Sequence, residues 1–335
     1  MRDLQIGFLG ATPPALGGGG VEIQRTRTAE GLRSLGHEVR DVECAPAEWS
    51  FDVLHAFTTE PHVWQFLQHW SRNPCPLVVT AVVVVSPGRQ ERLMRLGARL
   101  PGAVTSVRMR RHVLQRADAV IAGTRYEANL LTDALGADST RLHVIGNGAD
   151  VLPSPPGEAL PPLPDGRFVT MVGAISPRKR QLDVLRALGR SVPAVMVGPY
   201  VGGERGRAEW DSAVSDSGAT WVGAVHDPAV VQEIQRRAAA LLLISEAEVM
   251  SLAVLEALAV GTPVVLSDIP GHRELAEAHP GLVHVVQGPN EAAATARRLA
   301  GLAQDRQAAA VPSWAGVAEQ IEGVYRDLGI PSAPA

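Results

Sequence analysis

The sequence predicts an α/β protein with two doubly wound parallel sheets, and three observations support this prediction. Short apolar runs, such as Gln5–Leu9 and Leu241–Ile244, alternate with helical patterns along the chain. The alternation stops at Pro153–Pro164, where six of twelve residues are proline and regular structure cannot form. The length of 335 residues suits two globular domains. We therefore predict an N-terminal domain over 1–152, a stiff linker over 153–164, a C-terminal domain over 165–312 and a final helix over 313–330.

The composition indicates a globular protein that does not have nucleic acid as a partner. Of all residues, 46% are hydrophobic and 20% are charged, and the formal net charge is −4. Met1–Gly10 is too short and too polar for a signal peptide, and no apolar run approaches the ~18 residues of a membrane span. Cys44 and Cys75 lack the spacing of a metal site, so we expect free thiols. These features predict a cytoplasmic protein.

The first predicted strand, Gln5–Leu9, runs into a glycine-rich loop that precedes a helix over Val21–Leu35. The loop contains Gly17–Gly20. Such a loop between a first strand and a first helix can cradle a phosphate, and it can equally be a flexible connection. His37 follows the end of the helix, where an imidazole commonly caps carbonyls, so we interpret it as structural.

Two further apolar runs, Phe51–Ala56 and Leu77–Val85, are predicted strands, and the valine-rich second strand is expected to be buried on both faces. His55 closes the first of them. A lone histidine at a strand end is either a packing residue or a ligand contact. The domain then continues with a strand over Ala117–Ala122, a helix over Arg125–Leu135 and a strand over Arg141–Ile145.

Positive charge is concentrated between Arg89 and Arg116, where Glu91 is the single acid. Leucine and methionine residues are interleaved with the arginines, as in a partly amphipathic helix. Such a segment can make a peripheral contact with an anionic membrane, or bind an anionic acceptor. The alternative is a solvated arginine face on helices that pack by their leucines. The arginines are Arg89, Arg92, Arg95, Arg99, Arg108, Arg110, Arg111 and Arg116.

The alternation of strands and helices restarts after the linker. The predicted strands are Phe168–Val172, Ala194–Val197 and Thr220–Val222, and the predicted helices are Arg180–Leu188, Glu204–Ser215 and Pro228–Arg237. The stretch Leu241–Val265 then follows the order strand, loop, helix, strand, with Ser251 as the N-cap and with Gly261 and Pro263 ending the helix.

Glu248 and Glu256 are the candidate ligand-binding carboxylates of this stretch. Glu248 lies in the loop, and Glu256 lies about one turn past the helix start, roughly 6 Å along the axis. Glu256 is the only charge from Val249 to Ser267, on a helix that is apolar nearly all round. Two such carboxylates can bind hydroxyls at two ends of one polyol. The alternative is a solvated loop glutamate and a helix glutamate paired with a nearby arginine.

Glu248, seven intervening residues and then Glu256–Val265 (EALAVGTPVV) resemble the donor-site signature of family 4 glycosyltransferases, retaining enzymes of the GT-B fold. The resemblance implies two Rossmann-like domains that face an interdomain cleft. It also implies that Glu248 and the loop amides after it bind the donor sugar, and that Glu256 binds the ribose hydroxyls. The loop residues are Val249, Met250, Ser251 and Leu252, of which the first three stand where the family usually has Gly-Phe-Gly.

Other motifs extend the resemblance over nearly the whole chain. Gly19-Gly20-Val21 resembles the opening motif of the family, which makes Gly19 and Gly20 candidates for the donor diphosphate. His55 matches a histidine of the family near the interdomain cleft, which places it on the acceptor side. Ser313-Trp314 and Tyr325 fit the last helix of the family, which crosses back to the first domain.

Two further positions depart from the family. Gly173-Ala174-Ile175-Ser176-Pro177-Arg178-Lys179 resembles Gly-Arg-Leu-x-x-x-Lys, whose arginine and lysine hold the diphosphate; Lys179 matches, and Ala174 replaces the arginine. Arg178 and Arg180 flank Lys179, and we expect one of them to substitute. The chain has Thr80-Ala81-Val82 where the family has Thr-x-His, a histidine that lies beside the reacting sugar.

The resemblance predicts retaining transfer of a sugar from a nucleotide-diphosphate sugar to an unknown acceptor. The predicted catalytic residues are Lys179, Arg178 and Glu248, and Arg180 joins the donor-binding residues named above. Because no Asp-x-Asp motif is present, we expect no metal and no other cofactor, with cations and amides neutralising the diphosphate. Val82 and Ala174 leave open a protein that binds a nucleotide or sugar without turnover. An epimerase of the same fold lacks a recognisable acid–base pair.

Overall fold

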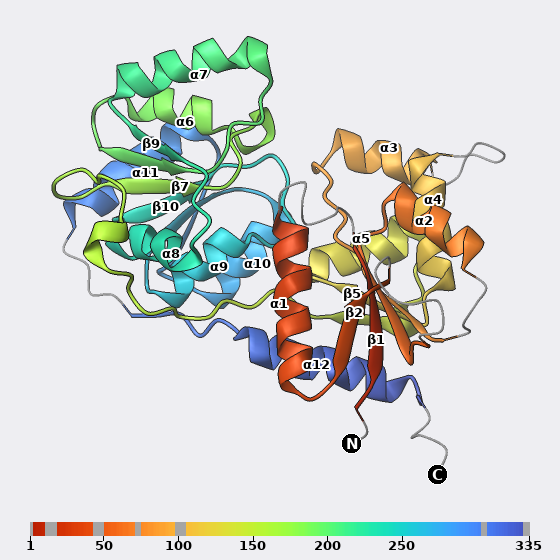
Figure 1. Cartoon of the computed structure of the whole chain (residues 1–335). Coiled ribbons are helices and arrows are strands. Elements are labelled where there is room, and N and C mark those ends of the chain that lie inside the picture. Colours follow the sequence, from red (N-terminus) through yellow and green to blue (C-terminus); the bar gives the residue numbers. More distant parts are fainter. Residues whose placement is uncertain are drawn as a thin grey trace. The chain divides into compact units, whose positions relative to one another are not determined.

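The computed structural model describes residues 3–10, 19–42, 50–70, 75–97, 105–302 and 307–330. They belong to two compact units, shown in Figure 1: unit 1 is Met1–Gly148 with Pro312–Ala335, and unit 2 is Ala149–Val311. The predictions for Gly17, Gly18, Cys44 and Arg99 lie outside the described residues.

Unit 1 contains a six-stranded, fully parallel sheet in the order β2-β1-β3-β4-β5-β6. Its strands β3, β4 and β5 are buried along their whole length, as expected for a parallel sheet covered on both faces. The strands are β1 (Gln5–Leu9), β2 (Glu38–Asp41), β3 (Val53–Phe57), β4 (Leu77–Thr80), β5 (Ala119–Ala122) and β6 (Leu142–Val144). The helices are α1 (Gly20–Ser34), α2 (Pro61–His69), α3 (Arg89–Gly97), α4 (Ser106–Arg116), α5 (Arg125–Leu135) and α12 (Trp314–Asp327).

Unit 2 contains a second six-stranded parallel sheet in the order β12-β11-β10-β7-β8-β9. The strands are β7 (Val169–Val172), β8 (Ala194–Val197), β9 (Thr220–Gly223), β10 (Ala240–Leu243), β11 (Val264–Ser267) and β12 (Val283–Val286). The helices are α6 (Gln181–Leu188), α7 (Glu204–Ser217), α8 (Pro228–Arg237), α9 (Leu252–Ala259), α10 (Pro270–Ala278) and α11 (Pro289–Gly301).

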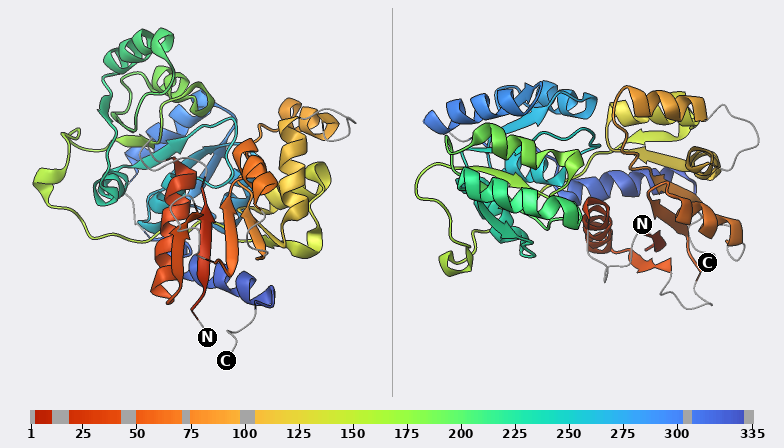
Figure 2. Two further views of the ribbon diagram at one scale, coloured as in Figure 1. Left: turned by 45° about the vertical axis from the view of Figure 1, so that its right-hand side comes forward. Right: turned by 90° about the horizontal axis from the view of Figure 1, so that it is seen from above.

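Helices cover both faces of the sheet of unit 2, as Figure 2 shows. Leu242 of β10 packs in one cluster with residues of α6, α7 and α11, whereas its neighbours Leu241 and Leu243 pack in another with α9 and α10. Successive side chains of a strand point to opposite faces, so a continuous apolar run serves two cores. Both units thus have the doubly wound, parallel-sheet architecture that the sequence predicts.

Two of the differences between predicted and observed element ends lie next to a non-glycine residue with a positive φ. The strand predicted over Leu77–Val85 stops at Thr80, because the backbone turns at Val82, whose φ is 47°. The helix predicted from Arg180 begins at Gln181, after a 3₁₀ turn over Pro177–Lys179. Arg180 itself has a φ of 53°, the left-handed region that a non-glycine residue adopts at a cost. Val82 lies in the loop after β4, and Arg180 lies in the loop after β7. Both residues therefore follow the carboxyl end of a strand.

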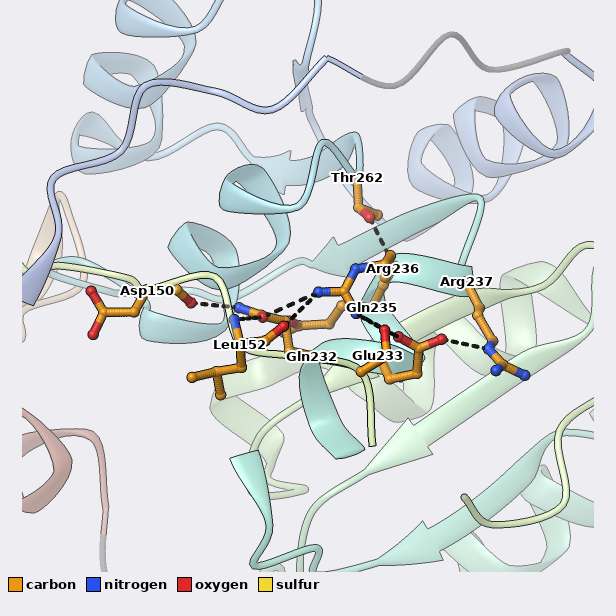
Figure 3. A network of polar contacts seen from close by, with 9 residues as sticks. Asp150, Leu152, Gln232, Glu233, Gln235, Arg236, Arg237 and Thr262 are labelled. Atoms are coloured by element: carbon orange, nitrogen blue, oxygen red, sulfur yellow. Dashed lines mark hydrogen bonds and ion pairs between the residues drawn. The ribbon is translucent and has the colours of Figure 1, made fainter. Parts of the chain in front are cut away.

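The segment predicted as an interdomain linker is bound along its start by α8, as Figure 3 shows. The Leu152 amide donates to Gln232 Oε1 at 2.7 Å, and Gln232 Nε2 donates to the Asp150 carbonyl at 2.8 Å. Ser154 Oγ donates to Glu233 Oε2 at 2.9 Å, and Arg236 Nη2 donates to the Leu152 carbonyl at 3.1 Å. Side chains of α8 therefore satisfy a backbone that has no strand partner. Pro153–Pro164 contains a single short 3₁₀ turn, Gly157–Ala159.

The last helix, α12, packs against α1 within unit 1. The contact is close at Gly31, where an added Cβ would lie 2.6 Å from the Cβ of Ala318. His37 joins the same region: its Nδ1 accepts the Leu4 amide at 3.2 Å, and its Nε2 lies 3.3 Å from Glu322 of α12. His37 is therefore structural, as predicted. None of the helices in the described residues combines the length and apolar character needed to cross a membrane.

Candidate functional site

The sheet of unit 2 reverses its strand order between β7 and β10. The chain forms β7 first, continues to β8 and β9 on one side, and then returns to place β10 on the other side of β7. The loops that leave the carboxyl ends of β7 and β10 therefore separate at this point, and such switch points bind ligands in open α/β sheets. The first loop carries Arg178, Lys179 and Arg180, and the second carries Glu248.

The two loops are joined by a cluster of charged groups around one carboxylate oxygen. Glu248 Oε1 accepts from Arg178 Nη1 at 3.0 Å and from Ser245 Oγ at 2.9 Å, and it lies 3.6 Å from Lys179 Nζ. Arg178 also donates to the Ala247 carbonyl, and the Glu246 amide donates to the Arg178 carbonyl at 2.9 Å. The structure thus brings together the three residues predicted to be catalytic. One carboxylate faces two cations, which leaves net positive charge in the cluster for an anionic ligand.

Gly173 allows Lys179 to lie against the end of β7. Its φ is 129°, and an added Cβ would lie 2.8 Å from Lys179 Nζ. A side chain at this position would be strained and would displace the ammonium group. The first residue of the Gly-x-x-x-x-x-Lys pattern is therefore glycine for a steric reason.

Arg180 is not part of the charged cluster. Its Nε donates to Asp183 Oδ2 at 3.1 Å, across the first turn of α6. Ala174, which stands in place of the arginine of the family, has its carbonyl bound by Gln181 Nε2 at 3.0 Å. Of the two arginines that flank Lys179, Arg178 is thus the one that shares its partner, Glu248.

The start of α9 provides backbone donors close to Glu248 in the sequence. Ser251 occupies the N-cap position, and its hydroxyl makes no capping hydrogen bond, whereas its carbonyl accepts from the Val254 amide at 3.2 Å. Ser251 is buried, whereas Val249, Met250 and Leu252 are partly exposed. This loop follows β10 and leads directly into the helix that carries Glu256.

Glu256 is the fifth residue of α9 and is partly exposed. Gln235 Nε2 of α8 donates to Glu256 Oε2 at 3.5 Å and to the Ala253 carbonyl at 3.1 Å. Gln235 is fully buried, and its backbone carbonyl accepts from Thr262 Oγ1 at 2.8 Å. The carboxylate of Glu256 is therefore met by an amide group. No sequence pattern indicates Gln235, since its contact with α9 arises only when α8 and α9 pack together.

Ser267 and His272 form a further part of this region; His272 lies in the motif Gly271–Glu274, which resembles Gly-x-x-Glu of the family. Ser267 Oγ at the end of β11 donates to the Ser245 carbonyl at 2.6 Å, and His272 Nδ1 lies 2.9 Å from the Ser267 carbonyl. Burial lowers the pKa of His272. A neutral imidazole with its proton on Nδ1 donates to that carbonyl, which couples α10 to the Ser245–Glu248 loop.

In unit 1 the predicted diphosphate residues, Gly19 and Gly20, lie at the start of α1. The Gly19 amide donates to Glu22 Oε2 at 2.8 Å, and a Cβ added to Gly20 would meet no atom within 4 Å. A carboxylate of the same helix thus binds the Gly19 amide that was expected to face phosphate. An anion that binds at this helix N-terminus would have to displace the Glu22 carboxylate from the Gly19 amide.

His55 is a core residue, which corrects the acceptor-side prediction for it. It lies within β3 and is fully buried, with Nδ1 2.6 Å from Tyr325 Oη and Nε2 2.8 Å from Thr80 Oγ1. The ring stacks on Phe57 with centroids 4.3 Å apart. Burial lowers its pKa to about 3, so the imidazole is neutral. With both nitrogens bonded and no exposed surface, His55 has no group to offer an acceptor.

Within the described ranges, no three His, Cys, Asp or Glu side chains are grouped so that they could hold a metal ion. That the reaction needs no metal stays a prediction.

Two family models match the chain in succession. The model described as "Glycosyltransferase Family 4" matches residues 45–151, and that described as "Glycosyl transferases group 1" matches residues 166–305. This chain belongs to the family 4 glycosyltransferases. The family assignment agrees with the position of the Lys179–Glu248 cluster at the switch point of the second sheet.

Curated relatives share this family over parts of the chain. D-inositol 3-phosphate glycosyltransferase of Rhodococcus erythropolis is 30% identical over 177 residues, 48% of this chain and 40% of the relative. Alpha-maltose-1-phosphate synthase of Mycolicibacterium smegmatis is 28% identical over 291 residues, 76% of this chain and 73% of that protein. The chain thus spans about two fifths of the length of the first of these relatives.

Solved structures establish the GT-B fold. Sucrose-phosphate synthase of Thermosynechococcus elongatus matches with a TM-score of 0.70 and 17% identity, covering 99% of this chain and 100% of that one. Anabaena HepE, whose structure contains UDP and glucose, matches with a TM-score of 0.64 and 18% identity, covering 97% and 98% of the two chains. Two Rossmann-like units of parallel sheet are the hallmark of this fold.

Proposed function

We propose that the protein transfers a sugar from a nucleotide-diphosphate sugar to an acceptor, with retention at the anomeric carbon and without a metal ion. The observation that carries this proposal is the cluster of Arg178, Lys179 and Glu248 at the switch point of a family 4 chain. A diphosphate leaving group needs preorganised positive charge, and this cluster has it.

Each group in the cluster has a chemical task in the proposed reaction. The ammonium of Lys179 has three donors, so it can keep Glu248 and also bind the diphosphate. Arg178 takes the place of the arginine that Ala174 replaces, and Glu248 orients the donor sugar through its second oxygen. The amides at the start of α9 and the carboxylate of Glu256 then bind the sugar and the ribose. The departing phosphate itself accepts the proton of the acceptor hydroxyl on the same face.

The experiment is to incubate the protein with a panel of nucleotide sugars and measure the release of nucleoside diphosphate. Lys179→Ala and Arg178→Ala should each lower turnover by about 10²- to 10³-fold, the loss expected for a preorganised electrostatic group. Arg180→Ala should change it far less, because Arg180 pairs with Asp183. Arg186→Ala, an exposed arginine of α6 that pairs with Glu209, is the control.

Turnover should persist in excess EDTA, since protein cations are proposed to do the work of a metal. Loss of turnover that magnesium or manganese restores would refute this part of the proposal.

The acceptor is proposed to carry an anionic group. Two curated relatives are named for D-inositol 3-phosphate and for alpha-maltose 1-phosphate, and both compounds are phosphorylated polyols. Unit 1 offers exposed Arg92 and Arg108, which have no ion-pair partner among the described residues. Addition of D-inositol 3-phosphate or glucose 1-phosphate to the turnover assay should increase the consumption of donor and yield a phosphorylated glycoside.

The second candidate function is binding of the nucleotide sugar without turnover, which Ala174 and Val82 favour. In that case calorimetry would detect nucleoside diphosphate binding that Glu256→Ala weakens, while no sugar of the panel is consumed.

A peripheral contact with an anionic membrane is also proposed for α3. Leu93 and Leu96 of this helix are 55% and 59% exposed, next to the exposed Arg92. Exposed leucines beside arginines are typical of helices that lie at a membrane surface. The protein should then co-sediment with vesicles that contain phosphatidylglycerol and not with phosphatidylcholine vesicles, and the binding should fade with salt. The double variant Leu93→Ser, Leu96→Ser should no longer bind the vesicles. If the unmodified protein does not sediment with anionic vesicles at low salt, the arginines of this region form a solvated face instead.

A further inference from the structure

Two strained residues lie at the carboxyl edge of the sheet of unit 1. Thr58, after β3, has a φ of 105°, and Val82, after β4, has a φ of 47°. Both are β-branched, and such residues adopt positive φ only when the surroundings force them to. The two turns are joined, because the Thr58 amide donates to the Thr80 carbonyl at 2.7 Å. Strained backbone of this kind gathers at functional sites.

The carboxylate of Glu127 holds the strained turn after β4. Its Oε1 accepts the Val83 amide at 2.6 Å, and its Oε2 accepts the Gly123 amide at 2.7 Å. The side chain begins on the first turn of α5 and is only 2% exposed. One carboxylate therefore connects the loops that follow β4 and β5. The Val83 amide would otherwise be a buried donor without a partner, since β4 ends at Thr80.

Glu127 is a carboxylate in surroundings that contribute little charge. Burial raises its pKa to about 7, opposed by the two amides that it accepts. The loops it joins, Ala81–Val85 and Ala122–Thr124, contain no titratable side chain. On its own helix the neighbours are Arg125 and Tyr126, and Tyr126 bonds to Glu91, which pairs with Arg95 of α3. His55 bonds to Thr80 at the end of β4 and is neutral.

We propose that Glu127 is a positioning residue, which holds Val82 in its strained conformation and so shapes the turn after β4 for the acceptor in the proposed reaction. This inference rests on the proposed glycosyl transfer, in which Val82 occupies the place of a histidine beside the reacting sugar. Val82 and Val85 are partly exposed and Val84 is exposed, so the held turn presents an apolar edge in place of an imidazole. Glu127 acts through the two amides and does not contact substrate.

The test compares Glu127→Gln with Thr124→Ala in the nucleoside diphosphate release assay at pH 5.5 to 8.5. The oxygen of a glutamine can accept one of the two backbone amides, but its NH₂ group is a donor and repels the other amide. A protonated Glu127 carboxyl has the same defect, because its O–H group is also a donor. Thr124→Ala is the matched control: it removes the hydroxyl that accepts the Glu127 amide at 3.0 Å, weakening the start of α5 but leaving the carboxylate in place.

At pH 8.5, Glu127→Gln should lower kcat at least tenfold without changing the Kd of the nucleoside diphosphate, because Glu127 contacts none of its proposed ligands. Thr124→Ala should keep kcat within twofold. The unmodified protein should lose kcat as the pH falls through about 7, toward the rate of Glu127→Gln, and the variant should lack this step. Hydrogen exchange at Val83 and Gly123 should be faster in Glu127→Gln alone. Equal kcat in the two variants, or a pH step that persists in Glu127→Gln, would overturn the inference.

A double-mutant cycle shows whether Glu127 acts through Val82. Glycine adopts a φ of 47° without strain, so in a Val82→Gly background the turn needs no restraint and Glu127→Gln should cost less than threefold in kcat. An equal loss in both backgrounds would refute the coupling. No donor consumption by the unmodified protein with any sugar would instead refute the proposed function, and the Kd measurement separates the two failures.

Discussion

At the scale of single residues, one buried hydrogen bond of unit 1 joins two neutral side chains that are distant in the sequence. Tyr325 is fully buried in α12, and its hydroxyl lies 2.6 Å from His55 Nδ1. Burial raises the pKa of Tyr325 and lowers that of His55, so both groups stay neutral at physiological pH. This hydrogen bond connects the last helix to the middle of the first sheet. The sequence left both a packing residue and a ligand contact open for His55, because a pattern of residues does not reveal that both nitrogens have partners.

Tyr325→Phe should destabilise the protein by about 1 to 3 kcal/mol, because it leaves a buried nitrogen of His55 without a partner. Urea unfolding measures the change. Tyr126→Phe is the control, since Tyr126 is partly exposed and its hydroxyl bonds to Glu91 at 3.1 Å; its cost should be below about 1 kcal/mol. Equal losses would show that the His55–Tyr325 contact has no special weight.

Glu127 should make stability depend on pH. Its pKa is raised from 4.5 to about 7 in the folded chain, so folding favours the protonated carboxyl. The stability that this group contributes is full below about pH 4.5 and is lost as the pH rises to about 7, by roughly 3 kcal/mol from the size of the shift. The difference in unfolding free energy between the unmodified protein and Glu127→Gln, measured from pH 4.5 to 8, should change by that amount. A constant difference would contradict the raised pKa.

Glu256→Ala should weaken nucleoside diphosphate binding by about 1 to 3 kcal/mol, the size of a lost charge-assisted hydrogen bond, without unfolding the protein. Calorimetry measures the affinity. Glu246→Ala is the control, since Glu246 is exposed in the preceding loop. Unchanged affinity in a folded Glu256→Ala variant would remove Glu256 from the site.

At the scale of elements, α8 has two roles. One face of the helix supplies Gln232, Glu233 and Arg236 to the segment Asp150–Ser154, and Gln235 reaches α9 at Ala253 and Glu256. The helix therefore connects the entry of the chain into unit 2 with the helix that carries the proposed ribose ligand. Proline content predicted a stiff interdomain linker from Pro153, and the side chains that bind its start come from a helix about eighty residues later.

Gln232→Ala should destabilise unit 2 by about 1 to 3 kcal/mol, because it leaves the Leu152 amide and the Asp150 carbonyl without their partner. Limited proteolysis should also cleave the released segment near Leu152 faster. Gln320→Ala is the matched control: this exposed glutamine of α12 bonds to the Gly316 carbonyl, at 3.3 Å, within its own helix. Equal proteolysis of the two variants would contradict the bracing role.

Local signals determined several elements well. The sequence predicts a helix over Arg125–Leu135, and α5 has these bounds. In the structure Thr124 caps its start and Gly136, with a φ of 67°, caps its end. Leu77–Val85 had an equally clear strand pattern, yet β4 stops at Thr80. Four consecutive valines favour a strand, but the Glu127 carboxylate offers Val83 a different partner. A tertiary contact thus overrode local propensity.

At the scale of the whole molecule, the sequence by itself determined the family, the two doubly wound sheets and the placement of charged residues in loops after strands. It could do so because periodicity, glycine and proline positions and short motifs act over a few residues. Only the tertiary structure decided which of these residues meet: Arg178 and not Arg180 at Glu248, Gln235 at Glu256, and His55 in the core. Strand order and helix packing bring together residues distant in sequence, and burial fixes which polar groups remain free for a ligand.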